Sequence, residues 1–493
     1  MAELLRITPQ DNVAVALTAL SSGQNVTVDG IALTTVTDVP AGHKVALFPI
    51  KAGEKVIKYG FPIGYAKEDI PVGAHVHVHN LHTGLSGELT YEYHPTYPTI
   101  PEIPAATFMG YPRKDGRVGV RNELWILPTV GCVNDIARQL ERAAQELVGG
   151  GVECVCAFPH PYGCSQMGDD QENTRTILAD LATHPNVGGV LVLGLGCENS
   201  SAAIIEEHMG DYDKSRVRFL VCQQVEDEFT EAMKLLRELA DNMRDEQRVP
   251  CPASKLVIGL KCGGSDGFSG ITANPVIGGF SDLLCGMGGT TILTEVPEMF
   301  GAETILMDRC KDEATFRKAV DLINNFKEYF IRHGQEVYEN PSPGNKAGGI
   351  TTLEDKSLGC TQKGGTAEVR DVLRYCEPVT EKGLNLVQGP GNDLCAITAL
   401  MASGAQMVLF TTGRGTPVGA PIPTVKVSTN TPLSEKKRNW IDFNAGILAQ
   451  GADMQETTEV FFKKLLAIAS GEQTQSEKHD YREIAIFKDG VTL

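Results

Sequence analysis

The sequence predicts an α/β protein, with a small all-β unit at its N-terminus followed by two domains built on parallel sheets. The first observation is a series of short β-rich runs up to about residue 85, broken by glycine or proline every 8 to 12 residues or so. The second is a change near residue 115, after which continuous apolar strands alternate with amphipathic helices. The third is the length of 493 residues, which is too long for a single hydrophobic core and therefore predicts several domains.

The N-terminal all-β unit is predicted over residues 1–95. Runs such as "NVTVDG" and "GAHVHVHN" are short, rich in β-formers and bounded by turn residues. The proline-rich stretch "YHPTYPTIPEIPAATFMGYP" follows without hydrophobic periodicity. It predicts a linker over residues 96–110.

Two α/β domains are predicted after the linker, over residues 111–250 and 251–493. "ELWILPT" and "VGGVLVLGLG" are apolar throughout, as strands buried on both faces tend to be, and "NDIARQLERAAQEL" between them is an amphipathic helix. "KLVIGL", "GTTILTE", "LNLVQG" and "QMVLFTT" repeat the strand pattern further on. The polar interruption "RDEQRVPCPAS" marks the boundary between the two domains.

The composition excludes several classes of function. A formal charge of −18 argues against a nucleic-acid or anionic-membrane surface, although a locally basic site for an acidic substrate stays compatible with it. No stretch approaches the roughly 20 apolar residues of a membrane span, and the start lacks the features of a signal peptide. We therefore expect a cytoplasmic protein whose 13 cysteines are reduced.

Four predicted strands in succession end in a loop that carries a cysteine beside a glycine. These cysteines are Cys132, Cys164, Cys197 and Cys262. Ligands of open parallel sheets bind beyond the carboxyl ends of the strands, so we expect the four thiols on one rim. The alternative is that they are core cysteines that happen to fall at strand ends.

The later strand-end loops carry charged and amide side chains instead. Glu295 follows "TILT", Lys346 lies in a Gly/Pro-rich loop, and Asn392 precedes a helix. Arg414 stands between two glycines in "TTGRGTP", a favourable place for a bidentate contact with a carboxylate. Each of these residues, considered alone, could equally be a solvent-exposed side chain of a loop. The prediction of a site depends on their joint placement at strand ends.

The stretch "HVHVHN" places His75, His77 and His79 at strict alternation. If this stretch is a strand, the three imidazoles point to the same side. They can then bind a metal or share a proton, or they can be solvated histidines of an edge strand. The spacing alone does not choose between these readings.

The chain resembles the altronate and galactarate dehydratases over nearly its whole length. "HKVAL", "VIKYGFPIGYA" and "GAHVHVHN" resemble the N-terminal SAF (β-clip) module of that family. "GVRNELWILPTVGCVN", "YGCSQMGDD", "LGLGCEN", "CGGSDGFSGITANP", "LTEVPEMFGAE" and "ENPSPGNKAGGITTLEDKSLGCTQK" look like its later blocks. "GCTQKGG" and the terminal "FKDGVTL" are closer to the altronate branch. One departure from the family pattern is Lys261, which stands where the family usually has glutamate.

The resemblance implies a hydro-lyase that converts D-altronate to 2-dehydro-3-deoxy-D-gluconate in hexuronate (galacturonate) catabolism, with Fe²⁺ or Mn²⁺ as cofactor. For this chemistry we predict imidazole ligands to the ion from His75, His77 and His79. An iron–sulfur cluster on Cys132, Cys164, Cys197 or Cys262 is the alternative. The predicted catalytic residues are His43, His77, His160 and Glu295. The predicted substrate-binding residues are Arg121, Lys346, Arg414 and Asn392.

The sequence is also compatible with other functions. Galactarate dehydratase and sulfolactate sulfo-lyase run similar eliminations on related acids, and a non-catalytic sugar-acid binding protein could keep the same fold. We expect a small sugar acid as the ligand, no nucleic-acid or membrane partner, and a homodimer.

Overall fold

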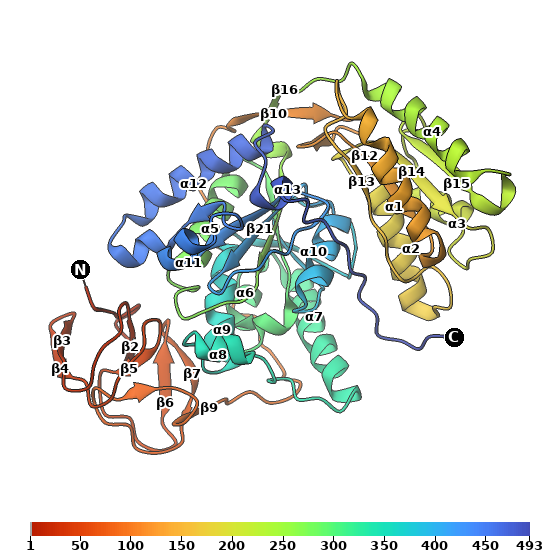
Figure 1. Cartoon of the computed structure of the whole chain (residues 1–493). Coiled ribbons are helices and arrows are strands. Elements are labelled where there is room, and N and C mark those ends of the chain that lie inside the picture. Colours follow the sequence, from red (N-terminus) through yellow and green to blue (C-terminus); the bar gives the residue numbers. More distant parts are fainter. Residues whose placement is uncertain (1) are drawn as a thin grey trace.

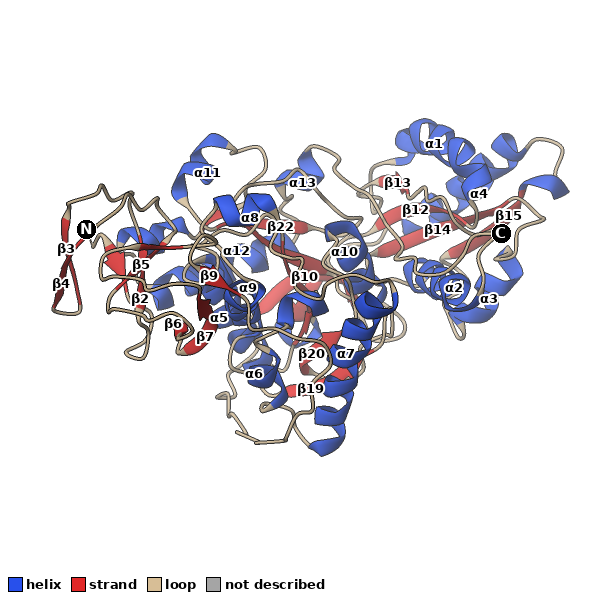
Figure 2. Cartoon of the chain, turned by 90° about the horizontal axis from the view of Figure 1, so that it is seen from below, coloured by secondary structure: helices blue, strands red, loops and turns tan. Residues whose placement is uncertain are grey.

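The computed structural model of the chain describes residues 2–493 and divides into three units (Figure 1). The N-terminal unit is coloured red in that view, the first α/β unit orange to yellow-green, and the second α/β unit green to blue. Seen from below, the second α/β unit lies between the other two (Figure 2). The predicted fold class, a small all-β unit followed by parallel-sheet α/β units, is confirmed. Among residues 2–493, no helix has the length and apolar content that a membrane crossing requires.

The N-terminal unit consists of short antiparallel strands around two small hydrophobic clusters. A four-stranded sheet has the order β1-β2-β5-β8, and a three-stranded sheet has the order β6-β7-β9, with β3 and β4 as a separate hairpin. The strands are β1 (Leu4–Leu5), β2 (Val13–Ala16), β3 (Asn25–Val28), β4 (Ile31–Thr34), β5 (Lys44–Ala46), β6 (Lys55–Lys58), β7 (Phe61–Ala66), β8 (His75–Val76) and β9 (Leu81–His82).

The histidine stretch is a strand for two residues only, which corrects the expectation of an alternating strand. β8 ends at Val76, and the chain turns over residues 77–80. The side chain of Asn80 holds this turn, because its Oδ1 accepts the N–H of His77 and its Nδ2 donates to the carbonyl of His75. The turn leaves His79 exposed, whereas His75 and His77 are half-buried.

The segment predicted as a linker, residues 96–110, has no regular structure up to residue 106 and then enters strand β10 (Thr107–Pro112). β10 pairs with β11 (Val118–Gly119) and with β16 (Val249–Pro252) in a three-stranded antiparallel sheet. The chain therefore enters and leaves the first α/β unit through neighbouring strands, and the polar interruption near residue 250 forms one of them.

The first α/β unit has a parallel sheet of order β13-β12-β14-β15. Leu124 and Ile126 pack with α1 and α4, while Trp125 and Leu127 pack with α2 and α3, so helices cover both faces. The strands are β12 (Glu123–Pro128), β13 (Val155–Ala157), β14 (Val187–Gly194) and β15 (Val217–Val221). The helices are α1 (Asn134–Ala143), α2 (Gly168–Ala182), α3 (Ala202–Met209) and α4 (Glu228–Met243).

The second α/β unit has a seven-stranded parallel sheet of order β19-β20-β18-β17-β21-β22-β23. Its strands are β17 (Val257–Cys262), β18 (Thr290–Leu293), β19 (Val369–Leu373), β20 (Gly383–Val387), β21 (Met407–Thr412), β22 (Thr424–Ser428) and β23 (Phe443–Asn444). Its helices are α5 (Ala273–Gly286), α6 (Glu303–Met307), α7 (Glu313–Arg332), α8 (Pro343–Ala347), α9 (Leu353–Cys360), α10 (Asp393–Ala402), α11 (Thr431–Lys436), α12 (Met454–Ala469) and α13 (Gln475–Lys478). Ile397 and Leu400 of α10 share a hydrophobic cluster with Trp125, so the cores of the two α/β units are continuous.

Candidate active site

The N-terminal unit is attached to the second α/β unit by a buried group of three charges. Lys44 Nζ lies 2.8 Å from Asp355 Oδ2, and Lys58 Nζ lies 3.0 Å from Asp355 Oδ1, with all three side chains at 3% exposure or less. Burial alone would raise the pKa of Asp355, but the two ammonium groups hold that pKa well below its usual range. Since Lys44 follows His43 in the chain, this contact fixes the place of His43 against the second α/β unit.

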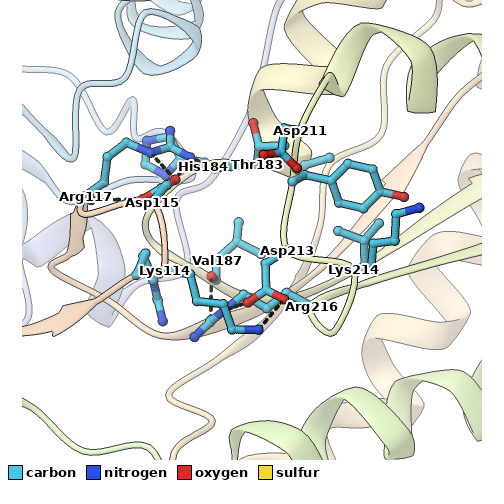
Figure 3. A pocket seen from close by; sticks show the side chains of 14 residues that line it. Lys114, Asp115, Arg117, Thr183, His184, Val187, Asp211, Asp213, Lys214 and Arg216 are labelled. Carbon is cyan, nitrogen blue, oxygen red and sulfur yellow. Dashed lines mark hydrogen bonds and ion pairs between the residues drawn. The ribbon is translucent and has the colours of Figure 1, made fainter.

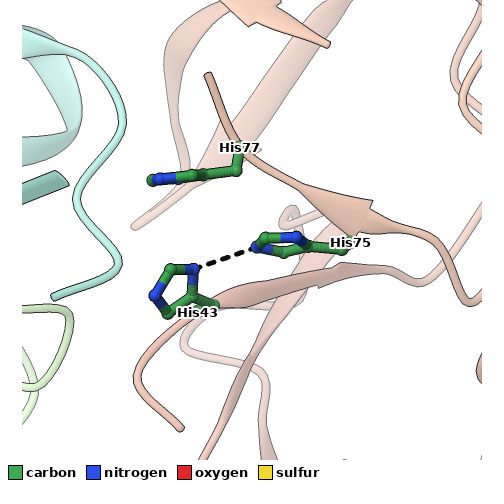
Figure 4. Close-up of side chains that lie close together, drawn as sticks. All are labelled: His43, His75 and His77. Atoms are coloured by element: carbon green, nitrogen blue, oxygen red, sulfur yellow. Dashed lines mark hydrogen bonds between the residues drawn. The ribbon is translucent and has the colours of Figure 1, made fainter. Parts of the chain in front are cut away.

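His43, His75 and His77 form a cluster at this contact (Figure 4). Nδ1 of His43 lies 2.9 Å from Nε2 of His75, and one ring nitrogen from each of the three residues lies within 4.8 Å of the others. Two nitrogens bound at about 2.1 Å to one ion, at right angles, stand about 3.0 Å apart. The spacing of this pair therefore matches two adjacent ligands of one divalent ion.

The second α/β unit also contacts the cluster. His77 Nδ1 lies 3.1 Å from Thr351 Oγ1, and His43 Nε2 lies 3.4 Å from the carbonyl oxygen of Ala347. The ring of His79 is centred 5.4 Å from that of His75, but His79 is exposed and its nitrogens are not part of the group. The three-imidazole set thus contains His43 in the place where the sequence predicted His79.

The imidazoles of the cluster are neutral at physiological pH. Burial lowers the pKa of His43, and it lowers the pKa of His75 to about 4, with the neighbouring His43 and His79 adding to the shift. Burial also lowers the pKa of His77 to about 3, and the charge of Lys44 contributes. A neutral imidazole is the form that binds metal ions, because its second nitrogen keeps a free electron pair.

We expect the metal-free protein to lose stability as the pH falls through this range. The unfolded chain protonates His75 and His77 near pH 6.5, at about the ordinary pKa of histidine, while the folded chain resists protonation. Their contribution is fully present above that pH and is lost as the pH falls toward about 4 and then 3. Denaturant unfolding at a series of pH values measures the effect. In a His75→Gln/His77→Gln double variant, the free energy of unfolding should decrease less steeply as the pH falls. The same pH dependence as in the wild type would contradict the assignment of this effect to the two histidines.

A cavity of about 500 Å³ opens at the carboxyl ends of the second sheet. Its lining residues are Cys262, Gly263, Gly264, Glu298, Glu339, Asn340, Pro341, Ser342, Pro343, Asn345, Lys346, Lys356, Gly391 and Asp393. Within residues 2–493, the half-buried Lys346 ammonium has no hydrogen-bond or ion-pair partner. The exposed guanidinium of Arg414, whose backbone N–H donates to the carbonyl of Gly264, has none either. One uncommitted cation, Lys346, thus lines a cavity of the size that small-molecule ligands use, and a second, Arg414, lies next to its lining residue Gly264.

Helix α8 lies between the cavity and the histidine cluster. Lys346 lines the cavity, and the carbonyl of the next residue, Ala347, faces His43. No histidine lines the cavity itself. The two features are therefore adjacent sites that share one short helix.

Glu295 lies beneath the cavity in a network of buried charges. Its carboxylate accepts hydrogen bonds from Lys261, from Lys363 at 3.2 Å and from the N–H of Cys262 at 2.9 Å. Its backbone has φ = 69°, an uncommon conformation for a residue with a side chain. Burial would lower the pKa of Lys261, but Glu295, Asp393 and Glu298 raise it above its usual range. Lys261, the departure from the family pattern, is thus a permanently charged partner of Glu295 in this chain.

The four predicted cysteines do not share one rim. Cys132, Cys164 and Cys197 are exposed on loops that follow strands of the first sheet. Hydrogen bonds join these loops, from Gly131 N to Tyr162 O and from Ser200 N to Gly163 O. Cys262 is buried at the end of β17 in the other sheet, which corrects the expectation of a common rim.

His160 and Asn392 have local structural roles. Nε2 of His160 lies 2.7 Å from the carbonyl of Pro128 and its Nδ1 accepts the N–H of Tyr162, so a 2%-exposed ring has no nitrogen left for a substrate proton. This corrects the predicted catalytic role of His160. Asn392 caps α10, because its Oδ1 accepts the N–H of Cys395. It is exposed beside the cavity but does not line it.

Arg121 is committed to an internal ion pair, contrary to the prediction that it binds substrate. Nε lies 2.6 Å and Nη2 3.0 Å from the carboxylate of Glu477, and the remaining N–H groups donate to backbone carbonyls. The residue is 3% exposed. It connects the start of the first α/β unit to α13 of the second.

We expect Arg121→Lys to destabilise the protein by about 1–3 kcal/mol, because an ammonium cannot replace the forked contact and leaves buried carbonyls without donors. The KM for a sugar acid should not change. Chemical unfolding and steady-state kinetics on the same preparation check both parts. A raised KM at unchanged stability would restore Arg121 to the substrate site.

A second cavity, of about 410 Å³, opens at the amino ends of β14 and β15 (Figure 3). Several of its cations are paired, as in Arg117 with Asp115, Lys114 with Asp213, and Arg216 with Asp213. Parallel sheets bind ligands at the opposite, carboxyl edge. The cavity at the end of the second sheet is therefore the stronger candidate.

Three family models match successive parts of the chain. They are the altronate/galactarate dehydratase SAF domain at residues 2–84, the D-galactarate dehydratase/altronate hydrolase second domain at 110–244, and the D-galactarate/altronate dehydratase C-terminal domain at 253–492. The altronate dehydratase of Escherichia coli (strain K12) is 55% identical over 494 residues, which cover 100% of both chains. The chain belongs to the altronate/galactarate dehydratase family.

Two further members of the family show where the chain stands within it. The altronate dehydratase of Bacillus subtilis (strain 168) is 54% identical over 499 residues, again 100% of both chains. The galactarate dehydratase (L-threo-forming) of E. coli is 32% identical over 511 residues, which cover 98% of this chain and 96% of that one. The resemblance seen in the sequence motifs is thus confirmed, and the altronate branch is much the more similar.

Sequence reasoning missed Asp355 and its two lysine partners. Asp355 lies in α9, whose residues are all buried although half of them are polar. A polar helix normally indicates a solvent-facing element, so nothing in the local sequence indicates that this helix is buried. The charges in "TTLEDKSLG" indicate a buried contact only when the structure shows Lys44 and Lys58 paired with Asp355.

Proposed function

We propose that this protein is a hydro-lyase that converts D-altronate to 2-dehydro-3-deoxy-D-gluconate and water. The observation that carries the proposal is the 55% and 54% identity, over full length, to the altronate dehydratases of two bacteria. The galactarate dehydratase stands at 32%. The diacid galactarate would also place a second carboxylate where altronate has a hydroxymethyl group.

The cavity at the end of the second sheet is the proposed substrate site. Lys346 lines this cavity without a partner among the described residues and suits the carboxylate of a sugar acid, and the exposed Arg414, whose backbone contacts the lining residue Gly264, is a second cation next to it. Lys356 adds a third positive charge at the wall, paired with Glu298 at 2.7 Å. Such charges hold the substrate and oppose the build-up of negative charge on its carboxylate.

The family implies a divalent ion, and the three imidazoles of His43, His75 and His77 suit it. Their ring nitrogens are close enough to share one ion, and they are neutral. Nitrogen donors of this kind suit Fe²⁺, with Mn²⁺ as the second choice. When bound at this cluster, which α8 separates from the cavity, such an ion would supply Lewis-acid positive charge beside the proposed position of the substrate carboxylate.

The elimination itself breaks two bonds of the sugar acid. A base takes the proton from C2, and the electron pair of the broken C–H bond is delocalised onto the carboxylate, which gives an enediolate. The C3–O bond then breaks, the departing hydroxide takes up a proton as water, and the enol becomes the 2-keto acid. Both steps are favoured by the positive charges at the cavity, because the first concentrates negative charge there.

A substrate panel tests the proposal directly. Purified protein supplied with Fe²⁺ is incubated with D-altronate, galactarate or (2R)-sulfolactate, and proton NMR follows the products. We expect the methylene signals of a 3-deoxy-2-keto acid with altronate, and much slower conversion of the other two. Faster turnover of galactarate or release of sulfite from sulfolactate would replace the proposal by those activities. Tight altronate binding without turnover would indicate a sugar-acid binding protein.

We also propose that the protein acts in the cytoplasm as a homodimer, without nucleic-acid or membrane partners. The acidic charge of −18 supports the absence of nucleic-acid contacts. Light scattering after size exclusion tests the oligomeric state.

A further inference from the structure

A second group of potential metal ligands lies at the floor of the cavity, away from the histidine cluster. Cys262 Sγ lies 3.3 Å from Cys360 Sγ and 3.3 Å from Glu298 Oε2, and Cys360 Sγ lies 3.2 Å from the same oxygen. All three residues are buried. They come from the end of β17, from the turn after β18 and from the last residue of α9.

The shape of this group is close to one face of a tetrahedral metal site. Ligands bound at about 2.3 Å through sulfur and 2.0–2.2 Å through oxygen stand about 3.5–3.8 Å apart in a tetrahedron. The three observed distances are shorter by only a few tenths of an ångström, so the side chains need to open slightly and need no new rotamers. Cys262 and Glu298 line the cavity, so a fourth coordination position would face the space where a ligand can enter.

Neighbouring lysines orient these ligands. Lys356 donates to Glu298 Oε1 at 2.7 Å, which leaves Oε2 directed at the two sulfur atoms. Lys363 Nζ lies 2.9 Å from Cys262 Sγ, and an N–H donor at that distance stabilises a thiolate. Supporting contacts of this kind are what hold metal ligands in place in proteins.

The charges around the group leave room for a divalent cation. With both thiols protonated, the network has equal numbers of cations and carboxylates, which are the buried Lys261, Lys356 and Lys363 against the buried Glu295 and Glu298 and the half-buried Asp393. Binding of M²⁺ with loss of the two thiol protons adds two positive charges and two negative ones. The net charge of the buried network does not change, so the site avoids the cost of an unbalanced buried charge.

We propose that Cys262, Cys360 and Glu298 bind one thiophilic divalent ion, such as Zn²⁺ or Fe²⁺, at the cavity floor. Sγ of each cysteine and Oε2 of the glutamate are the ligands, and two protons are released for each ion that binds. This site is distinct from the three imidazoles and differs from them in ligand softness, since thiolates select zinc and iron over the harder manganese and magnesium. Metal binding here does not depend on the proposed altronate activity.

Cobalt(II) is the probe, because its thiolate complexes absorb in the near ultraviolet while its imidazole complexes do not. Reduced, chelator-treated full-length protein is titrated with Co²⁺ without oxygen, and absorbance and proton release are followed. We expect a thiolate-to-cobalt band that saturates at one ion per chain, with two protons released. Cys262→Ser and Cys360→Ser should each lose most of the band and bind Co²⁺ more than about 10-fold more weakly. Loss of a residue that only supports a metal ligand already weakens binding about 10-fold, so loss of a ligand itself should weaken it more.

Two control variants make the result specific. Cys154 and Cys156 form another close thiol pair, with sulfurs 3.1 Å apart, and Cys156→Ser should leave the band unchanged. His77→Gln should also leave it unchanged, since the imidazoles form a separate site. If the wild-type protein binds Co²⁺ without a thiolate band, or if Cys156→Ser removes the band, the proposal is overturned. The wild-type spectrum alone can contradict the proposal, so the test remains valid if a variant fails to fold. The test does not depend on altronate turnover.

Discussion

Replacing Asp355 by asparagine is expected to lower the free energy of unfolding by about 3–5 kcal/mol, the usual cost of removing one partner from a buried ion pair. Asp355 serves two lysines of the N-terminal unit, and all three side chains are almost completely buried. The neutral amide leaves two ammonium groups without a counter-charge. Burial already lowers the pKa of Lys44 to about 8, so we expect this lysine to lose its proton first. Urea unfolding at pH 7 measures the change.

The matched control is Asp69→Asn, which breaks the pair of Asp69 with Lys51. That pair has a similar separation of 2.8 Å, but its side chains are more than 60% exposed. Exposed pairs contribute little, so this variant should unfold at nearly the same urea concentration as the wild type. Equal effects of the two variants would show that the buried pair does not hold the N-terminal unit in place.

Removal of divalent ions is expected to lower altronate turnover by at least about 10³-fold, because Lewis-acid stabilisation supplies several kcal/mol and each 1.4 kcal/mol is about tenfold in rate. Added Fe²⁺ should restore the activity. In His77→Gln we expect restoration to need at least about 10-fold more Fe²⁺, since one of three imidazole ligands is missing. Turnover is measured against free Fe²⁺ under anaerobic conditions.

His82→Gln is the control for this second prediction. His82 is exposed in the same unit, and its Nδ1 contacts only the carbonyl of the next residue. Its Fe²⁺ requirement should equal that of the wild type. Full turnover by thoroughly chelated protein, or the same Fe²⁺ curve for His77→Gln, would remove the imidazole cluster from the mechanism.

The fold could be predicted from sequence wherever burial leaves a continuous local signal. β14 is buried at every position and reads "VGGVLVLG", so its apolar run identifies a central parallel strand without reference to the rest of the chain. The same holds for β12 and β21. The position of Lys346 at the cavity agrees with the rule that parallel sheets bind ligands at their carboxyl ends, and Arg414 lies next to the lining residue Gly264.

The rest depends on contacts between distant residues. "HVHVHN" has the alternation of a strand, but the side chain of Asn80 closes a turn that removes His79 from the cluster and leaves a place for His43. Arg121 lies in a motif block, and only the position of Glu477, more than 350 residues later, shows that its charge is already used. His160 is occupied by backbone groups in the same way.

The link between Asp355 and the N-terminal lysines has a consequence for biosynthesis. Lys58 leaves the ribosome 297 residues ahead of its partner, which is about 15–60 s at ordinary rates of translation. During that interval Lys44 and Lys58 have no carboxylate partner from α9. Docking can begin only when α9 has been translated. The three imidazoles, which all belong to the N-terminal unit, can assemble early, whereas their contacts with Thr351 and Ala347 form only after most of the polypeptide exists.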